Sequence, residues 1–208
     1  MRPILILFLV LAGLAGPGAA DAAAGKPVIL VLGDSLSAGY GVPVDEGWVA
    51  LLQRRLDGEG YGYTVVNASV SGETTVGGLE RLPRALARHK PAIVIVELGG
   101  NDGLRGLPVP ELRVNLEAII RASRSAGAKV LLAGIRIPPN YGPRYTEQFY
   151  AVYGELAREL RVAWVPFFLE GIALRDDLFQ DDGIHPDLQA QPILLDNVWP
   201  VLKPLLRR

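Results

Sequence analysis

The chain has 208 residues, of which half are hydrophobic and 21% are charged, and its formal net charge is −1. This length suits one domain with a sizeable core, and the composition excludes a disordered chain. The charge balance gives no indication of a nucleic-acid partner, and the absence of cysteine excludes a Cys nucleophile, a thiolate zinc site and a disulfide framework.

The N-terminal segment has the layout of a secretory signal peptide. Arg2 precedes an apolar stretch at 4–14, and small residues with Ala-x-Ala matches follow. The apolar stretch is shorter than the ~20 residues that span a bilayer, which favours cleavage over a membrane anchor. We therefore expect a signal peptide at 1–24, a mature domain at 25–208, and a periplasmic or secreted protein without a stable membrane anchor.

Downstream of this segment, apolar runs typical of buried strands alternate with segments whose apolar residues recur at helical spacing. The predicted strands are 27–32, 63–70, 92–98, 129–137 and 162–165. The predicted helices are 48–56, a stripe of Leu79, Leu82 and Leu86 broken at Pro83, then 111–126, 145–160 and a tail at 189–206 with a kink or break at Pro200. This alternation predicts an α/β fold with a parallel sheet and helices on both faces.

Four short polar and glycine-rich clusters interrupt the apolar pattern, at 33–36, 71–73, 99–102 and 182–186. Three of them directly follow a predicted strand. Since ligands of parallel sheets bind outside the carboxyl ends of the strands, we expect these three clusters to converge at one edge of the sheet.

Ser35 is a candidate nucleophile, although a serine in such a turn more often caps a helix or a turn. Ser37 stands where a G-x-S-x-G elbow would need its second glycine, so the common α/β-hydrolase arrangement is not indicated. The nucleophile needs a base, and His89 lies in a basic link at the wrong edge of the sheet. His185 follows Asp182 by three residues, which lets Asp182 orient one ring nitrogen while the other faces Ser35.

Two other interpretations of this last cluster remain. Its polar residues could only satisfy backbone donors near a helix start, with Pro186 fixing the entry to the last helix. Asp181, Asp182 and His185 are also metal-ligand types, but no His-x-x-x-His motif or Cys pair supplies the remaining ligands, so no metal is expected.

Gly72 and Asn101 are candidate oxyanion donors beside the backbone N–H of Ser35. Gly72 lets its own N–H approach a substrate closely, and Asn101 offers a side-chain amide at a strand end. The alternative for Asn101 is bracing a turn, which is also the role expected of Asp34 and Asp102.

Together the four blocks resemble those of the SGNH (GDSL) hydrolases, and most closely the bacterial thioesterase I/protease I/lysophospholipase L1-like arylesterase subgroup. The resemblance rests on the stretches 33–41, 96–106, 135–142 and 180–186 and covers essentially the whole mature chain. It implies a flavodoxin-like three-layer αβα fold with a central five-stranded parallel sheet, and no metal or cofactor. The catalytic residues would be Ser35, Asp182 and His185, with an oxyanion hole of Ser35, Gly72 and Asn101.

The expected reaction is hydrolysis through an acyl-enzyme, and the resemblance implies small-molecule acyl esters, acyl thioesters and lysophospholipids as substrates. Apolar loops suggest Leu104, Pro139 and Tyr141 as substrate contacts, although such residues also suit a simple cover over the sheet. The resemblance further implies a mobile loop after Gly72, and we expect a monomer.

Two alternatives from other classes are an acetyl esterase or acyltransferase acting on envelope carbohydrate, and a non-catalytic binding module. The binding module would lack Ser35, Asn101 or His185, and none of the three is missing.

Overall fold

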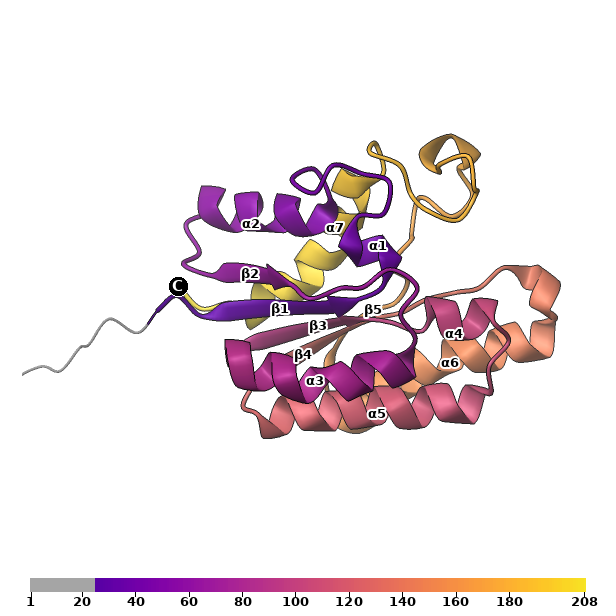
Figure 1. The fold of residues 1–208 in the computed structure, drawn as a ribbon, viewed down its shortest axis with the longest axis horizontal. Helices are drawn as coiled ribbons and strands as arrows, with labels where there is room; N and C mark the ends of the chain where they lie inside the picture. The colour runs from indigo at the N-terminus through magenta and orange to yellow at the C-terminus, as the bar shows by residue number, and fades with distance from the viewer. Residues whose placement is uncertain (1–24) are drawn as a thin grey trace, which may run out of the picture.

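The structure, a computed structural model, describes residues 25–208, so the expected signal peptide at 1–24 lies outside the described residues. Within residues 25–208, five strands form one parallel sheet in the order β2-β1-β3-β4-β5, and helices cover both faces (Figure 1). The predicted three-layer α/β architecture is confirmed. The strands are β1 (Val28–Gly33), β2 (Thr64–Asn67), β3 (Ile93–Glu97), β4 (Lys129–Ala133) and β5 (Ala163–Val165).

Two groups of helices enclose the sheet. On one face α2 packs against α7, and on the other α3, α5 and α6 pack side by side (Figure 1). The α-helices are α1 (Ser35–Ala38), α2 (Trp48–Gly58), α3 (Thr75–His89), α4 (Gly100–Leu104), α5 (Val109–Ser125), α6 (Pro143–Leu160) and α7 (Gln191–Leu202). Three 3₁₀ turns complete the described elements: η1 (Pro139–Tyr141), η2 (Asp176–Leu178) and η3 (Lys203–Leu205).

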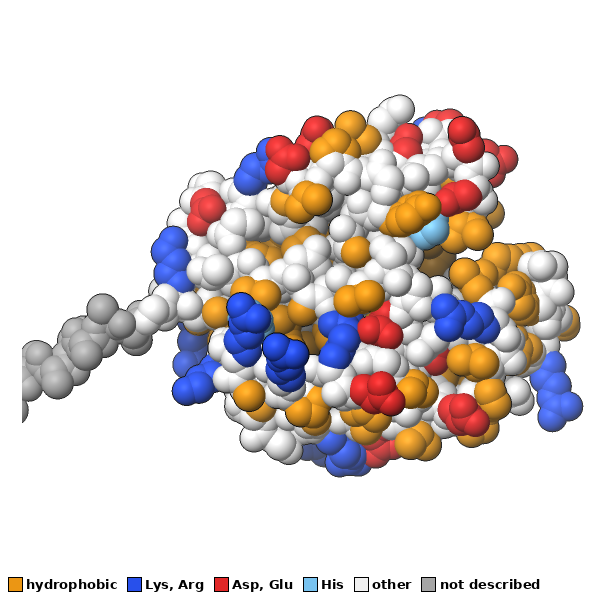
Figure 2. All heavy atoms as spheres, viewed as in Figure 1, with side chains coloured by type: hydrophobic (Ala, Val, Ile, Leu, Met, Phe, Trp, Pro, Cys, Tyr) orange, Lys and Arg blue, Asp and Glu red, His pale blue; other side chains and the backbone are white. Residues whose placement is uncertain are grey.

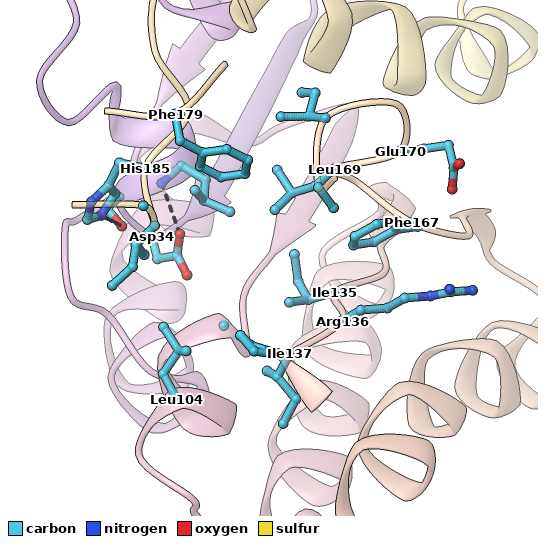
Figure 3. A pocket seen from close by; sticks show the side chains of 18 of the residues that line it. Asp34, Leu104, Ile135, Arg136, Ile137, Phe167, Leu169, Glu170, Phe179 and His185 are labelled. Atoms are coloured by element: carbon cyan, nitrogen blue, oxygen red, sulfur yellow. Dashed lines mark hydrogen bonds between the residues drawn. The ribbon is translucent and has the colours of Figure 1, made fainter. Parts of the chain in front are cut away.

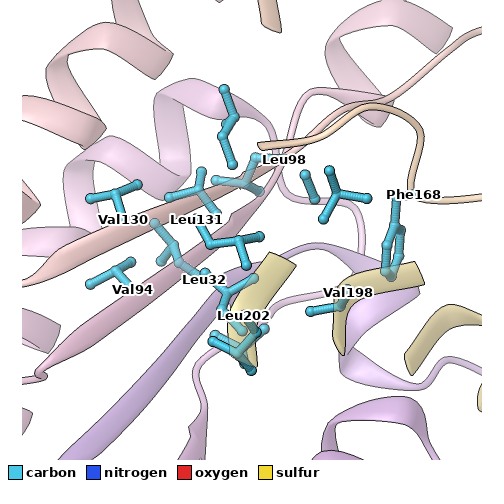
Figure 4. Packing of buried hydrophobic residues seen from close by; sticks show 14 of the residues in the cluster. Leu32, Val94, Leu98, Val130, Leu131, Phe168, Val198 and Leu202 are labelled. Carbon is cyan, nitrogen blue, oxygen red and sulfur yellow. The ribbon is translucent and has the colours of Figure 1, made fainter. Parts of the chain in front are cut away.

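The central strands are buried on both faces, which explains their continuous apolar runs. Leu32, Val94 and Leu131 come from three adjacent strands, and α7 adds Val198 and Leu202 to the same core (Figure 4). All five side chains are at most 2% exposed. Burying each such side chain stabilises the fold by about 1.5–3 kcal/mol, so the sheet is a rigid base for the loops at its edge.

Two prolines lie inside continuous helices, so no break is found at Pro83 or Pro200, whereas a kink at Pro200 stays a prediction. Pro83 is within α3 and Pro200 is within α7, and both are exposed. A proline on the solvent side leaves the unpaired carbonyl of the preceding turn free to bond water, so the helix continues past it.

Two predicted strands end earlier than expected. The second stops at Asn67 rather than at residue 70, and the fourth stops at Ala133 rather than at residue 137. In the fourth, a side chain at Gly134 would lie 2.3 Å from the carbonyl oxygen of Pro166, so the chain passes closely beside its neighbour before it leaves the sheet. Residues 135–137 then turn toward the strand-end surface.

The expected entry of the last helix at Pro186 is also wrong. α7 begins only at Gln191, and Pro186 instead forms an antiparallel bridge with Phe179. The Asp182–His185 cluster therefore lies in a hairpin-like loop rather than at a helix start.

The strand order predicts a binding site at the carboxyl ends of β1 and β3. The chain runs outward in opposite directions from β1 and β3, which pair directly with Gly33 opposite Glu97. In open parallel sheets, such a reversal opens a crevice at the carboxyl ends of the two strands. The segments that follow β1 and β3 carry Ser35 and Asn101.

Candidate active site

Ser35 is the first residue of α1, directly after β1. Asp34 caps this short helix, because its carboxylate accepts a hydrogen bond of 3.0 Å from the backbone N–H of Leu36. The Ser35 side chain is mostly buried, and it borders the large pocket described below. The turn after β1 thus directs the hydroxyl toward the edge of the sheet.

Ser35, His185 and Asp182 form a hydrogen-bonded chain. Ser35 Oγ lies 2.9 Å from His185 Nε2, and His185 Nδ1 lies 2.6 Å from Asp182 Oδ2. His89, the other histidine, ends α3 close to the start of β3 and thus at the opposite edge of the sheet. The structure therefore brings together the three residues predicted as nucleophile, base and acid.

Asp182 is held as a carboxylate by its own loop. Its Oδ1 accepts backbone N–H groups from both Ile184 and His185 at 2.9 Å. The backbone and ring hydrogen bonds from His185, followed by that of Ile184, lower the pKa of Asp182 to about 2. A charged Asp182 favours the tautomer in which Nδ1 carries a proton and Nε2 is free to accept one.

Asn101 lies in α4, one residue after the helix start, and its amide has two acceptors. Nδ2 donates to Asp34 Oδ2 at 3.1 Å and to the carbonyl of Glu73 at 3.0 Å. Asn101 borders the pocket, as does Ser35. In this arrangement an oxyanion would have to share or replace one of the two bonds.

Gly72 is not among the residues that line the pocket. Its φ of +78° is in the left-handed region, which favours glycine at this position. Its carbonyl accepts a 2.9 Å hydrogen bond from Arg105, and Arg81 joins the neighbouring Glu73 to the carbonyl of Gly33. Sequence reasoning assigned no role to either arginine, and the contribution of Gly72 to oxyanion binding stays a prediction.

A pair of buried carboxyls lies beneath the site, at Asp34 and Glu97. Glu97 Oε2 accepts a 2.7 Å hydrogen bond from the hydroxyl of Ser37, whereas the buried Oε1 has no partner in the described part of the chain. Burial raises the pKa of Asp34 to about 6, against the hydrogen bonds from Leu36 and Asn101 that lower it. Burial, and then the charge of Asp34, raise the pKa of Glu97 well above the ordinary range of a carboxyl.

A pocket of about 790 Å³ opens beside Ser35 and His185. Figure 3 shows His185 on one side of it and Ile135, Ile137 and Phe167 on the other. Hydrophobic side chains also surround the hollow in the molecular surface at this edge (Figure 2). The pocket is lined by Asp34, Ser35, Leu36, Gly100, Asn101, Leu104, residues 135–139, Phe167, residues 169–174, Phe179 and residues 183–185.

Of the three predicted substrate contacts, Leu104 and Pro139 line this pocket, and Tyr141 does not. The Tyr141 hydroxyl instead donates to the carbonyl of Leu104 at 2.7 Å, so it supports the wall from outside.

Sequence reasoning missed the opposite wall, which comes from the segment between β5 and η2. Leu169 and Ile172 of this segment line the pocket, and Leu174 at its tip is 98% exposed. The Arg136 side chain, although it belongs to the lining, stacks its guanidinium on the rings of Tyr150 and Phe167. Apart from Arg136 and Glu170, the residues that line the pocket from 135–139, 167 and 169–174 are apolar or glycine.

Among residues 25–208, no three His, Cys, Asp or Glu side chains cluster in a way that could hold a metal ion. Over the same residues, no helix is both long enough and apolar enough to cross a membrane.

The chain matches the GDSL-like lipase/acylhydrolase family over residues 31–191. The esterase TesA of Pseudomonas aeruginosa is 58% identical over 183 residues, which cover 88% of this chain and 91% of that protein. The thioesterase 1/protease 1/lysophospholipase L1 of Escherichia coli K12 is 46% identical over 184 residues, which cover 88% of this chain and 87% of that protein.

Solved structures show the same relationship. A crystal structure of TesA matches with a TM-score of 0.84 at 59% identity, covering 86% of this chain and 99% of that chain. The psychrotrophic esterase EstA from Pseudoalteromonas sp. matches with a TM-score of 0.82 at 43% identity, covering 86% and 98%. The chain therefore belongs to the GDSL-like lipase/acylhydrolase family, as its four sequence blocks predicted, and like these relatives it is a carboxylic ester hydrolase.

Proposed function

We propose that the protein cleaves carboxylic ester and thioester bonds through a Ser35-His185-Asp182 triad and an acyl-enzyme intermediate. The observation that carries this proposal is the continuous chain of short contacts from Asp182 through His185 to Ser35, placed at the mouth of an apolar pocket. Nucleophile, base and orienting acid within hydrogen-bond reach of one another are what acyl transfer requires.

In the first step, Ser35 Oγ attacks the carbonyl carbon of the substrate while His185 Nε2 takes the hydroxyl proton. The Asp182 carboxylate stabilises the imidazolium that forms. The tetrahedral intermediate collapses when the bond to the leaving alcohol or thiol breaks, and His185 gives its proton to that leaving group. The acyl group is then esterified to Ser35.

In the second step, His185 removes a proton from a water molecule that attacks the acyl-enzyme. Collapse of the second intermediate releases the carboxylic acid, and the proton returns from His185 to Ser35 Oγ. In both steps the backbone N–H groups of Ser35 and Gly72 and the amide of Asn101 stabilise the developing oxyanion.

The proposed substrates are acyl esters, acyl thioesters and lysophospholipids with an alkyl or aryl acyl group. The size of the pocket and its Ile, Leu and Phe lining support an acyl group larger than acetyl. We further propose that the enzyme acts as a monomer. An ester series from acetyl to palmitoyl, with one lysophospholipid, one acyl-CoA and one acetylated polysaccharide, distinguishes this reaction from deacetylation of envelope carbohydrate.

The nucleophile assignment is tested with Ser35→Ala. We expect p-nitrophenyl ester hydrolysis to fall by on the order of 10⁶-fold, because the acyl group has no acceptor. Thermal unfolding should be nearly unchanged, since the hydroxyl is replaced by a small apolar group at the pocket edge. Ser69→Ala, a matched change outside the pocket, should retain full activity. A Ser35→Ala enzyme with most of its activity would refute the triad.

A further inference from the structure

Ser35 and His185 lie 150 residues apart on different segments, and their side-chain contact alone does not explain how they stay aligned. Asp182 and His185 belong to a loop between Phe179 and Pro186 that is closed by a single bridge. Within this loop, residues 181–184 are exposed. A connection other than this bridge is therefore needed to fix the position of the loop relative to α1.

Gln180 closes the loop and joins it to the segment after α1. Its backbone N–H donates to the carbonyl of His185 at 2.8 Å, as one of the two hydrogen bonds of the Phe179–Pro186 bridge. Its side-chain Nε2 donates to the carbonyl of Pro186 at 3.1 Å and to the carbonyl of Tyr40 at 2.7 Å. Gln180 is thus hydrogen-bonded both to the far end of its own loop and to the segment after α1.

Tyr40 continues this connection to the nucleophile. Its backbone N–H donates to the carbonyl of Ser35 at 3.1 Å, and its ring lies against the ring of His185, with 4.4 Å between ring centroids. The backbones of Ser35 and His185 are therefore linked through Tyr40 and Gln180 by three hydrogen bonds. This path runs beside the direct contact between the two side chains.

Gly41 makes room for the Gln180 side chain. A Cβ atom at position 41 would lie 2.0 Å from Gln180 Oε1, and φ is +70° at this residue. Gly39, in the same segment, has a similar φ of +75° but nothing within 4 Å of an added Cβ. The two glycines therefore differ in their contact with Gln180 and not in their backbone region.

We propose that Gln180 is a positioning residue that holds the Asp182–His185 loop in register with Ser35 through Tyr40. This inference rests on the proposed triad, because alignment affects activity only if His185 activates Ser35. A misplacement of about 1 Å between reacting groups can lower a rate about 10²-fold. Loss of the Gln180 side-chain contacts should consequently reduce the reactivity of Ser35, while the pocket wall formed by residues 135–139 and 169–174 stays in place.

The first test is Gln180→Glu, which keeps the shape of the side chain but replaces both N–H donors with a carboxylate oxygen facing two carbonyls. We expect kcat for p-nitrophenyl butyrate to fall by about 10–100-fold, with little change in KM. The rate at which a p-nitrophenyl alkylphosphonate inactivates the enzyme, measured from p-nitrophenolate release, should fall in parallel, since it reports the nucleophilicity of Ser35. Gln53→Glu is the matched control.

Gln53 suits this purpose because its Nε2 also makes two hydrogen bonds, to Asp57 and to the carbonyl of Tyr63, away from the pocket. Gln53→Glu should lower the unfolding temperature without changing kcat of the folded enzyme. If Gln180→Glu keeps the wild-type kcat, or if the two variants lose activity only in proportion to unfolded protein, the inference is wrong.

A second pair of variants leaves the chemistry of Gln180 intact. Gly41→Ala should displace the Gln180 side chain and lower kcat and phosphonylation together, whereas Gly39→Ala should strain the backbone to a similar degree with a much smaller loss. Equal losses in the pair would overturn the inference, and this pair decides the matter if Gln180→Glu does not fold. An active Ser35→Ala enzyme would instead refute the proposed function.

Discussion

At the scale of single residues, Glu97 is the buried carboxyl beneath the proposed triad, and the hydroxyl of Ser37 donates to its Oε2. The placement of Ser35 after a predicted strand and the Asp182–His185 spacing are local signals in the sequence, and the structure brings these three residues within hydrogen-bond reach. The sequence carries no signal for the burial of Glu97, because a carboxyl at the end of an apolar strand is normally expected to face solvent. Its burial follows only from the pairing of β1 with β3, which sequence patterns do not specify.

The buried Glu97 makes stability depend on pH. Its raised pKa means that the folded state keeps a proton that the unfolded chain has already released, so the unfolding free energy falls as pH rises above the ordinary pKa of a carboxyl. Glu97→Gln removes this titration and keeps an acceptor for Ser37. We expect urea unfolding at pH 5, 6.5 and 8 to show a smaller decline for the variant than for the wild type.

Asp34, whose pKa burial raises to about 6, shifts stability in the same direction, so part of the decline should remain in that variant. Glu80→Gln, at an exposed position of α3, is the control for the loss of a surface carboxyl. Parallel curves for the wild type and Glu97→Gln would mean that Glu97 releases its proton equally in both states.

Asn101 is the second residue whose role can be isolated. Asn101→Ala removes the proposed oxyanion donor, and we expect kcat to fall by about 10²–10³-fold with a smaller change in KM. Steady-state kinetics on p-nitrophenyl esters measure this split. Asn115→Ala removes an amide that bonds Thr75 Oγ1 away from the pocket and should keep kcat. A loss confined to KM would place Asn101 in ground-state binding instead.

At the scale of elements, buried strands and long amphipathic helices were predicted, and short elements were not. α1 and α4 span four and five residues, too few for a periodic pattern, yet they carry Ser35 and Asn101. The two interior prolines were misjudged for a different reason. Sequence alone does not tell whether the carbonyl that loses its partner faces solvent or the core.

Pro83 gives a test of this explanation. Pro83→Ala restores an N–H for the carbonyl of Leu79 and removes the ring, which should raise the unfolding free energy by about 2 kcal/mol after allowance for the more flexible unfolded chain. Activity should be unchanged. Pro110→Ala, in the first turn of α5 where no intrahelical N–H bond is lost, should not stabilise the protein. Equal urea midpoints for the two variants would contradict the argument.

At the scale of the whole molecule, topology assembles the site from segments that sequence patterns treat separately. The order β2-β1-β3-β4-β5 sets the ends of β1 and β3 side by side, and the parallel direction brings the following loops to one edge (Figure 1). The far wall of the pocket, between β5 and η2, could not be foreseen because it has neither periodicity nor a motif. Its Leu and Ile residues acquire a role only from where the sheet places them.

The last prediction concerns the expected division into a signal peptide at 1–24 and a mature domain at 25–208. Among the described residues, the first sheet hydrogen bonds involve Pro27 and Val28, and every described residue of the pocket and of the proposed triad follows Gly33, so cleavage between Asp21 and Lys26 would keep all of them. Expressed with its leader in Escherichia coli, the protein should appear in the periplasmic fraction with an N-terminus in that interval, as read by Edman sequencing. Leu9→Arg, which breaks the apolar stretch, should leave the protein unprocessed.

A chain beginning at Gly25 should have the specific activity of the processed enzyme. An inactive or unfolded product would show that the domain needs the residues that precede Gly25.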